Sequence, residues 1–225
     1  MKYEIMGGNL PAVICKLSKG ENIICEGGGM SWMDDVFTMA TSGGGLKKMF
    51  GKAFSGESMF MNTYTANADG EIAFASSFPG DILAVEIGAG KSIVAQKKAF
   101  LACEGGVDMS VFFQKKLSGG FFGGEGFIME KFTGNGIVFL EVDGSIKEYT
   151  LAPGERKIME TGHLVMMEET CSLSVERIKG AKNILLGGEG LFNTVVTGPG
   201  KVVIQTMPIS KTAELIAGFL PKTNS

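Results

Sequence analysis

The segment Leu17–Met33, LSKGENIICEGGGMSWM, decides the fold because two further stretches of the chain resemble it. They are Ile87–Cys103, IGAGKSIVAQKKAFLAC, and Leu151–Met167, LAPGERKIMETGHLVMM. Each begins with an aliphatic residue, two further residues and a glycine, and then continues into an apolar run and a turn of small residues. A glycine turn that leads into a short apolar run is typical of a β-strand. Its recurrence predicts an internal repeat.

We call the glycine near the start of each of these segments the first mark, and two further glycine marks recur at matched distances from it. A Gly-Glu pair follows the first glycine after 34 to 36 residues, and another glycine follows that pair after 12 to 14 residues. The marks are Gly20, Gly90 and Gly154; the pairs Gly56-Glu57, Gly124-Glu125 and Gly188-Glu189; and Gly70, Gly136 and Gly200. The period of 64 to 70 residues predicts repeats over about 11–80, 81–144 and 145–209, with a strand after every mark.

These patterns predict an all-β fold of three related antiparallel units in one compact body of the β-sandwich type. One unit has too little sheet to bury a face alone, so the three are expected to share a core. No atypical polar cap marks either end, which favours closure about a pseudo-threefold axis over a linear stack. The exception is a short helix at 210–221, with Ser210 as its cap and an apolar stripe of Leu215, Ile216, Phe219 and Leu220.

Composition narrows the class of protein. The chain has 225 residues, of which 34 are glycine and 44% are hydrophobic, so intrinsic disorder is not expected. The net charge of −3 argues against nonspecific electrostatic binding of nucleic acid. No apolar run reaches the length of a membrane span, and the N-terminus lacks a signal-peptide pattern, so we expect a cytoplasmic protein.

No spacing of reactive residues indicates a catalytic or metal site. Cys15, Cys25, Cys103 and Cys171 form no C-x-x-C pair, and His163 is the only histidine. Buried thiols and a turn or packing histidine are therefore expected, with no cofactor. The segment from Gly88 to Ser92, GAGKS, resembles the end of a phosphate-binding loop, but Val85 stands where that loop needs a glycine and a strand-like run follows.

The chain resembles the AIM24 family from about Tyr3 to Met207. The segments that carry this resemblance are GGGMSWM at 27–33, FPG at 78–80, AFLA at 99–102, GGEGF at 123–127, GHLV at 162–165, GEGLF at 188–192 and GPGKV at 198–202. The resemblance implies a fold related to the tryptophan RNA-binding attenuation protein (TRAP) and a tendency to form homo-oligomers. It implies no catalytic residues. A mitochondrial member is linked to inner-membrane organisation, but this chain lacks a transit peptide, so that location is not expected here.

Two sets of charged residues are candidate sites. Equivalent positions in the repeats could join a basic patch that holds RNA, anionic lipid or another anion; alternatively, these lysines protect edge strands from aggregation. The patch comprises Lys47, Lys48, Lys52, Lys115, Lys116, Arg177, Lys179 and Lys182. The repeated Glu57, Glu125 and Glu189 could form a ring of carboxylates that binds a cation or serves acid–base chemistry. Alternatively, each glutamate lies in a solvated turn, which is where Gly-Glu pairs usually occur.

Three functions follow from these observations. The first is a non-enzymatic β-rich assembly or scaffold protein that acts by self-association and protein contacts. The second is an RNA- or anion-binding module that uses the basic segments. The third is a small-molecule-binding protein or enzyme that uses the repeated carboxylates in a cavity, which would require a perturbed pKa there.

Overall fold

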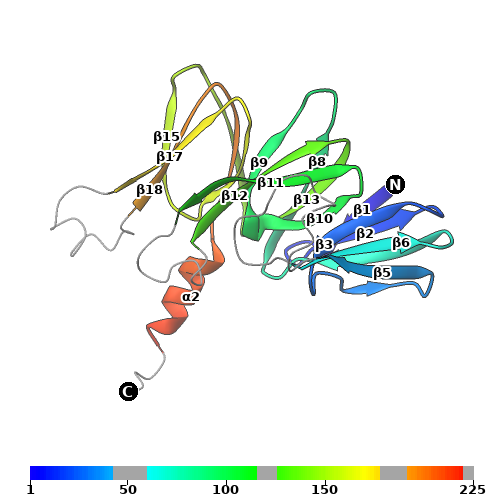
Figure 1. Cartoon of the computed structure of the whole chain (residues 1–225). Coiled ribbons are helices and arrows are strands. Elements are labelled where there is room, and N and C mark those ends of the chain that lie inside the picture. Colours follow the sequence, from blue (N-terminus) through cyan, green and yellow to red (C-terminus); the bar gives the residue numbers. More distant parts are fainter. Residues whose placement is uncertain (43–59, 116–125, 178–191, 220–225) are drawn as a thin grey trace.

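The computed structural model describes residues 1–42, 60–115, 126–177 and 192–219. These residues form antiparallel β-sheets and one short α-helix near the C-terminal end (Figure 1). The predicted all-β class with a short C-terminal helix is therefore confirmed. Within the described ranges, no helix is long and apolar enough to cross a bilayer.

The strands after β1 fall into three sets of six, which we call units 1, 2 and 3. Unit 1 contains β2 (Ala12–Leu17), β3 (Asn22–Glu26), β4 (Trp32–Met33), β5 (Phe37–Ser42), β6 (Met61–Ala66) and β7 (Gly70–Ala75). Unit 2 contains β8 (Gly80–Ile87), β9 (Ile93–Gln96), β10 (Phe100–Glu104), β11 (Val107–Lys115), β12 (Phe127–Gly134) and β13 (Gly136–Asp143), with the 3-10 turn η1 (Lys97–Ala99). Unit 3 contains β14 (Ile146–Leu151), β15 (Arg156–Glu160), β16 (Leu164–Glu168), β17 (Ser172–Arg177), β18 (Phe192–Thr197) and β19 (Gly200–Gln205).

The strands of each unit pair in the same way. The second strand pairs with the fifth and the fifth with the fourth, while the first pairs with the sixth and the sixth with the third. The sheets then continue from unit to unit, because the second strand of one unit pairs with the third strand of the next. These two junctions are β3 with β10 and β9 with β16. The repeat boundaries stay predictions.

Four sheets result from this pairing. The first sheet has the order β1-β2-β7-β4, in which β1 (Lys2–Met6) extends unit 1. The second and third are the six-stranded sheets β5-β6-β3-β10-β13-β8 and β11-β12-β9-β16-β19-β14, and the fourth is β15-β18-β17. Apolar clusters fill the space between consecutive sheets. The two inner sheets are therefore covered on both faces, which explains why β9 and β10 are almost continuously buried.

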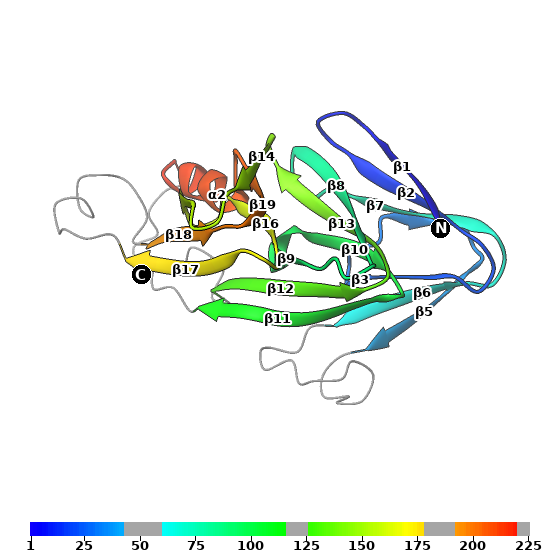
Figure 2. The same ribbon diagram turned by 90° about the horizontal axis from the view of Figure 1, so that it is seen from above.

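The units lie in an open row that does not close on itself among the described strands. Figures 1 and 2 show unit 2 between unit 1 and unit 3. Among the described strands, none of unit 3 pairs with one of unit 1. The expected closed arrangement is therefore wrong. It was expected because neither end carries a polar cap. In the open row, β4 of unit 1 and β15 of unit 3 have no partner from a neighbouring unit among the described strands.

Strands follow the glycine marks as the sequence predicts. β3, β9 and β15 follow Gly20, Gly90 and Gly154, while β7, β13 and β19 begin at the third-mark glycines. At the first mark the backbone φ is +89°, +81° and +77°, a left-handed conformation that glycine adopts without strain. The second-mark glycines lie outside the described residues, and β6, β12 and β18 follow them. A left-handed glycine turn thus precedes the second strand of each unit.

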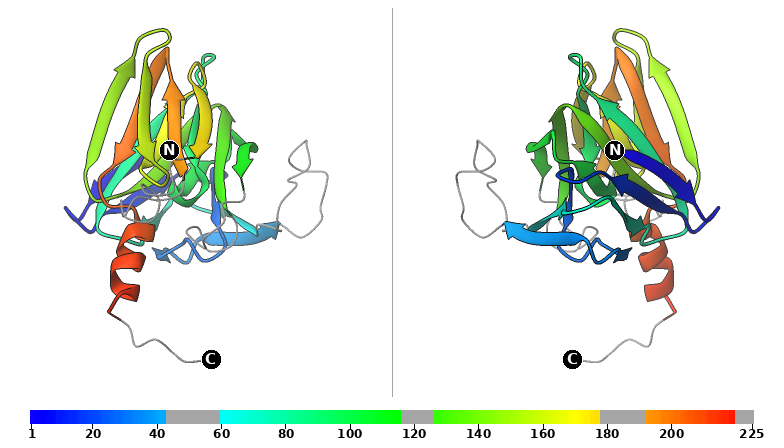
Figure 3. Two further views of the ribbon diagram at one scale, coloured as in Figure 1. Left: turned by 90° about the vertical axis from the view of Figure 1, so that its left-hand side faces the viewer. Right: turned by 90° about the vertical axis from the view of Figure 1, so that its right-hand side faces the viewer.

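The helix α2 (Ile209–Ala217) stands away from the sheets (Figures 1 and 3). Its first backbone N–H, on Ile209, donates to Asp143 Oδ2 at 2.7 Å, so the cap comes from β13 of unit 2. The predicted cap, Ser210, lies inside the helix instead. Lys211 Nζ binds Glu160 Oε1 at 2.6 Å. No side chain of α2 is buried, so these polar contacts hold the helix to the body.

Candidate functional site

At each end of the row, one strand lacks the partner from a neighbouring unit that its counterparts have at the internal junctions. At the unit 1 end, β4 pairs only with β7, and at the unit 3 end, β15 pairs only with β18 among the described strands. Both edges carry large apolar side chains. Trp32 and Met33 on β4 are 48% and 38% exposed, and Ile158 on β15 is 56% exposed. We call β4 and β15 the row-end edges.

Acidic residues at the end of the third strand show which positions correspond in the three units. Asp34, Glu104 and Glu168 each accept a hydrogen bond from the backbone N–H that follows the third-mark glycine, at 2.8 to 2.9 Å. The donors are Glu71, Ile137 and Lys201. This contact, which we call the carboxylate clamp, was missed in the sequence. The visible signal is an acidic residue 32 to 36 positions before each third-mark glycine.

The clamp places Met33 in line with Cys103 and Met167, which immediately precede Glu104 and Glu168. Cys103 and Met167 are fully buried, whereas Met33 is exposed. The second strand of a preceding unit pairs with β10 and with β16, while β4 has no such neighbour among the described strands. The exposure of Met33 is therefore a consequence of its place at the end of the row.

The same comparison applies to the second strands. Counted from the first-mark glycines, Ile158 corresponds to Ile24 and Val94, four residues after Gly154, Gly20 and Gly90. Ile24 and Val94 belong to apolar clusters and are buried. Ile158 occupies the equivalent place on an edge that nothing covers among the described residues. A single exposed apolar residue is ordinary, but here the exposed positions on both edges match positions that are buried at the internal junctions.

The predicted basic patch lies mostly outside the described residues. Those positions are Lys47, Lys48, Lys52, Lys116, Lys179 and Lys182. The two that are described come together near Phe192 on β18. Lys115 Nζ donates to Val175 O at 2.9 Å and lies 5.4 Å from the Phe192 ring, and Arg177 is paired in register with Phe192.

The predicted carboxylate ring, Glu57, Glu125 and Glu189, lies entirely outside the described residues. The ring stays a prediction. Within the described ranges, no group of three or more His, Cys, Asp or Glu side chains is arranged to hold a metal ion.

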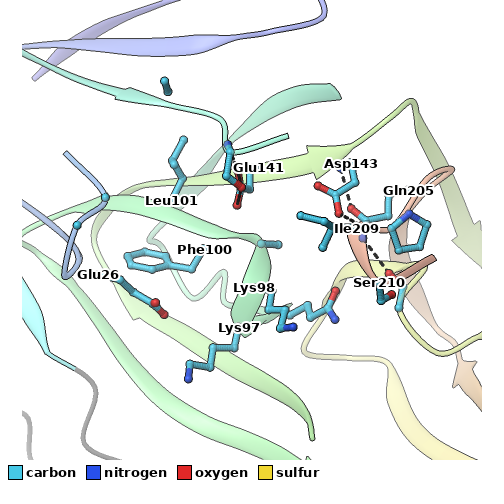
Figure 4. Close-up of a pocket in the computed structure, with 18 of the residues that line it drawn as sticks. Glu26, Lys97, Lys98, Phe100, Leu101, Glu141, Asp143, Gln205, Ile209 and Ser210 are labelled. Carbon is cyan, nitrogen blue, oxygen red and sulfur yellow. Dashed lines mark hydrogen bonds between the residues drawn. The ribbon is translucent and has the colours of Figure 1, made fainter. Parts of the chain in front are cut away.

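A cavity of about 510 Å³ lies where the turns after the second strands of all three units meet (Figure 4). Its lining includes Lys97 and Lys98 from η1 and the carboxylates of Glu26, Glu141 and Asp143. Glu141 accepts hydrogen bonds from Ser76 and Ser77 at 2.7 to 3.1 Å. Those contacts join unit 2 to the end of unit 1.

Asp143 connects the cavity to the base of α2. Burial raises the pKa of its carboxyl, while the bond from Ile209 N and the charge of Lys98 oppose this rise. Its backbone N–H donates to Gln205 Oε1 at 2.9 Å, and Gln205 Nε2 donates to Gly162 O at 2.8 Å. Each polar group in this series of hydrogen bonds positions another part of the backbone. The arrangement therefore favours a structural role for these carboxylates over acid–base chemistry.

The remaining reactive side chains have structural surroundings. All four cysteines are free and buried. Burial raises the pKa of Cys15 to about 12 and of Cys25 to about 11, and it also raises the pKa values of Cys103 and Cys171. His163 lies in the turn before β16, with Nδ1 2.8 Å from Gln205 O. A nucleophilic thiol requires a lowered pKa and access to solvent, so these thiols lack the surroundings of a nucleophile.

Comparisons with known proteins agree over nearly the whole chain. The family model described as mitochondrial biogenesis AIM24 matches residues 3–207. An uncharacterized protein of Streptococcus pyogenes serotype M6 is 30% identical over 224 residues, which cover 96% of this chain and 89% of that protein. A crystal structure of a Streptococcus pyogenes protein superposes with a TM-score of 0.79 at 26% identity, covering 97% of this chain and 99% of that one.

Proposed function

The chain belongs to the AIM24 family, and on that premise we propose that it is a non-enzymatic assembly protein that acts by self-association and protein contacts. The observation that carries this proposal is the pair of row-end edges. Each edge exposes apolar side chains at positions that are buried at both internal junctions. An uncovered strand edge is a ready template for pairing with another chain, and natural proteins usually protect such edges with charge, proline or a bulge.

Self-association is tested by sedimentation velocity on the full chain over a range of concentrations. The expected result is a sedimentation coefficient that rises with concentration, because a contact of modest area follows mass action between about 1 and 100 µM. A single species at the monomer mass of 23.8 kDa at every concentration would overturn the proposal.

The RNA- or anion-binding function remains an alternative proposal. It is supported by the gathering of Lys115 and Arg177, from units 2 and 3, beside one aromatic ring. RNA titration at two salt concentrations separates it from assembly, because phosphate contacts weaken steeply as salt rises. Absence of binding at low salt would remove it.

The small-molecule function has the cavity of about 510 Å³ as its support. Against it, Glu141 and Asp143 are both engaged in holding backbone segments. A ligand would have to compete with those internal contacts, so the geometry supports assembly better. Thermal-shift measurements with small anionic and cationic probes test this function, and no shift with any of them would count against it.

A further inference from the structure

The two internal junctions show how one unit of this fold accepts the next. At the first, Ile24 pairs with Cys103 and Ile23 with Glu104. At the second, Val94 pairs with Met167 and Ile93 with Glu168. Both junctions are antiparallel, and both place the clamp carboxylate opposite the residue three positions after a first-mark glycine. The junction register is therefore the same at both places.

The row-end edges are the two halves of a third junction of this kind. The second strand β15 lacks a following unit, and the third strand β4 lacks a preceding one. We propose that β15 of one copy pairs antiparallel with β4 of a second copy, in the register of the internal junctions. Ile158 then faces Met33, Lys157 faces Asp34, and Met159 faces Trp32. This proposal rests on the proposed self-association and specifies its surface.

Side-chain chemistry at the two edges is complementary in that register. Ile158 and Met33 are exposed apolar side chains, and pairing removes both from water as it does for Val94 and Met167. Lys157 and Asp34 bring opposite charges together, where the internal junctions place isoleucine against glutamate. Oppositely charged cross-strand neighbours stabilise a pair of strands, whereas like charges would oppose it.

Each copy carries one edge of each kind, so the contact is head to tail. β15 of one copy meets β4 of the next, and that copy's own β15 stays available. Such heterologous contacts produce a ring when the rotation closes and a filament when it does not. A two-fold dimer in which identical edges meet is a different arrangement, because β15 against β15 would place Lys157 near its own counterpart.

Two variants and their mixture test the direction of the contact. Ile158→Lys introduces a charge on β15 and leaves β4 intact, while Met33→Lys does the reverse. On its own, each variant has only one of the two intact edges that the junction needs. We therefore expect its self-association constant to fall at least about tenfold. Mixed in equal amounts, the intact β15 of one variant meets the intact β4 of the other, which produces a capped dimer of twice 23.8 kDa.

Controls separate this junction from self-association as such. Met39→Lys, at an exposed apolar position on β5, is the matched control and should associate as the wild type does. Circular dichroism and melting temperature check that each variant is folded. If the wild type associates but neither variant weakens it, or if the mixture stays monomeric, the head-to-tail junction is wrong and the assembly function stands. A monomeric wild type overturns both.

A disulfide cross-link tests the register. Because the native cysteines are buried, introduced surface cysteines react selectively. The Ile158→Cys protein mixed with the Met33→Cys protein should form a mixed disulfide faster than the Ile158→Cys protein mixed with the Met39→Cys protein, since directly opposed strand residues lie within disulfide reach. Equal rates in the two mixtures, or a predominance of disulfides between two copies of the Ile158→Cys protein, would overturn the proposed register.

Discussion

Replacement of Asp143 by alanine should release α2 from the body of the protein. Asp143 Oδ2 accepts the first N–H of the helix at 2.7 Å, and no side chain of α2 is buried. A nine-residue helix is marginal on its own in water, so its order depends on contacts with the body. Loss of a capping acceptor typically costs about 0.5 to 2 kcal/mol, and a bond to a charged acceptor falls in the upper part of that range.

This cost applies to the local equilibrium in which α2 opens, because the bond to Asp143 and the Lys211–Glu160 ion pair both join the helix to the sheets. A loss of about 1 to 2 kcal/mol corresponds to roughly a five- to thirtyfold decrease in protection of the helical amides. Hydrogen exchange followed by mass spectrometry on peptides that cover 208–219 measures this decrease. The strands of unit 2 should keep their protection, since Asp143 keeps its backbone bonds to Gln205 and Met207.

Asp143→Asn is the matched control. Asparagine keeps an oxygen acceptor of the same length and is as good a cap as aspartate, so protection of α2 should stay within about threefold of wild type. If Asp143→Ala leaves the exchange of α2 unchanged, or if the asparagine variant loses as much protection as the alanine variant, the capping argument is refuted.

Three further predictions concern pH, the carboxylate clamp and the thiols. Burial raises the folded-state pKa of Asp143 above its unfolded value near 3.8, so the stability that this group contributes is present below pH 3.8 and is lost as pH rises through the folded-state pKa. In urea unfolding, Asp143→Asn should therefore gain stability relative to wild type from pH 3 to 7. A difference that stays constant with pH would contradict this. Glu168→Ala should lower the free energy of unfolding by about 0.5 to 1.5 kcal/mol, because the exposed Lys201 N–H exchanges its carboxylate acceptor for water. Glu168→Gln should recover most of this loss, and equal losses in the two variants would argue against the clamp. Cys15 should react with a thiol reagent at pH 8 only after unfolding. Its pKa of about 12, against an ordinary value of 9, lowers its thiolate fraction about a thousandfold. Rapid reaction in the folded state would refute its burial.

The sequence by itself determined the features that depend on local conformation. A left-handed turn requires glycine, so Gly20, Gly90 and Gly154 could be recognised, and the strands that follow them are found where predicted. The C-terminal helix was visible in its 3.6-residue period, and it spans Ile209–Ala217. The all-β class followed from the same local signals.

Tertiary structure decided which groups meet. The cap of α2 comes from Asp143, 66 residues away, rather than from Ser210 inside the helix. The clamp carboxylates bind backbone N–H groups 33 to 37 residues later, and only their spacing hints at this. Long-range partners such as these are selected by packing and strand register, which a single sequence does not display.

The arrangement of the units depended on the same kind of information. Open and closed rows use the same local turns and strands, and the rotation between successive units decides whether β15 meets β4. The sequence showed that neither end carries a polar cap, and the structure showed what that means. Trp32, Met33 and Ile158 are apolar like most of their buried counterparts, so the sequence alone does not mark them as exposed. They are exposed because pairing between neighbouring strands, unlike turn geometry, requires a second unit to be present.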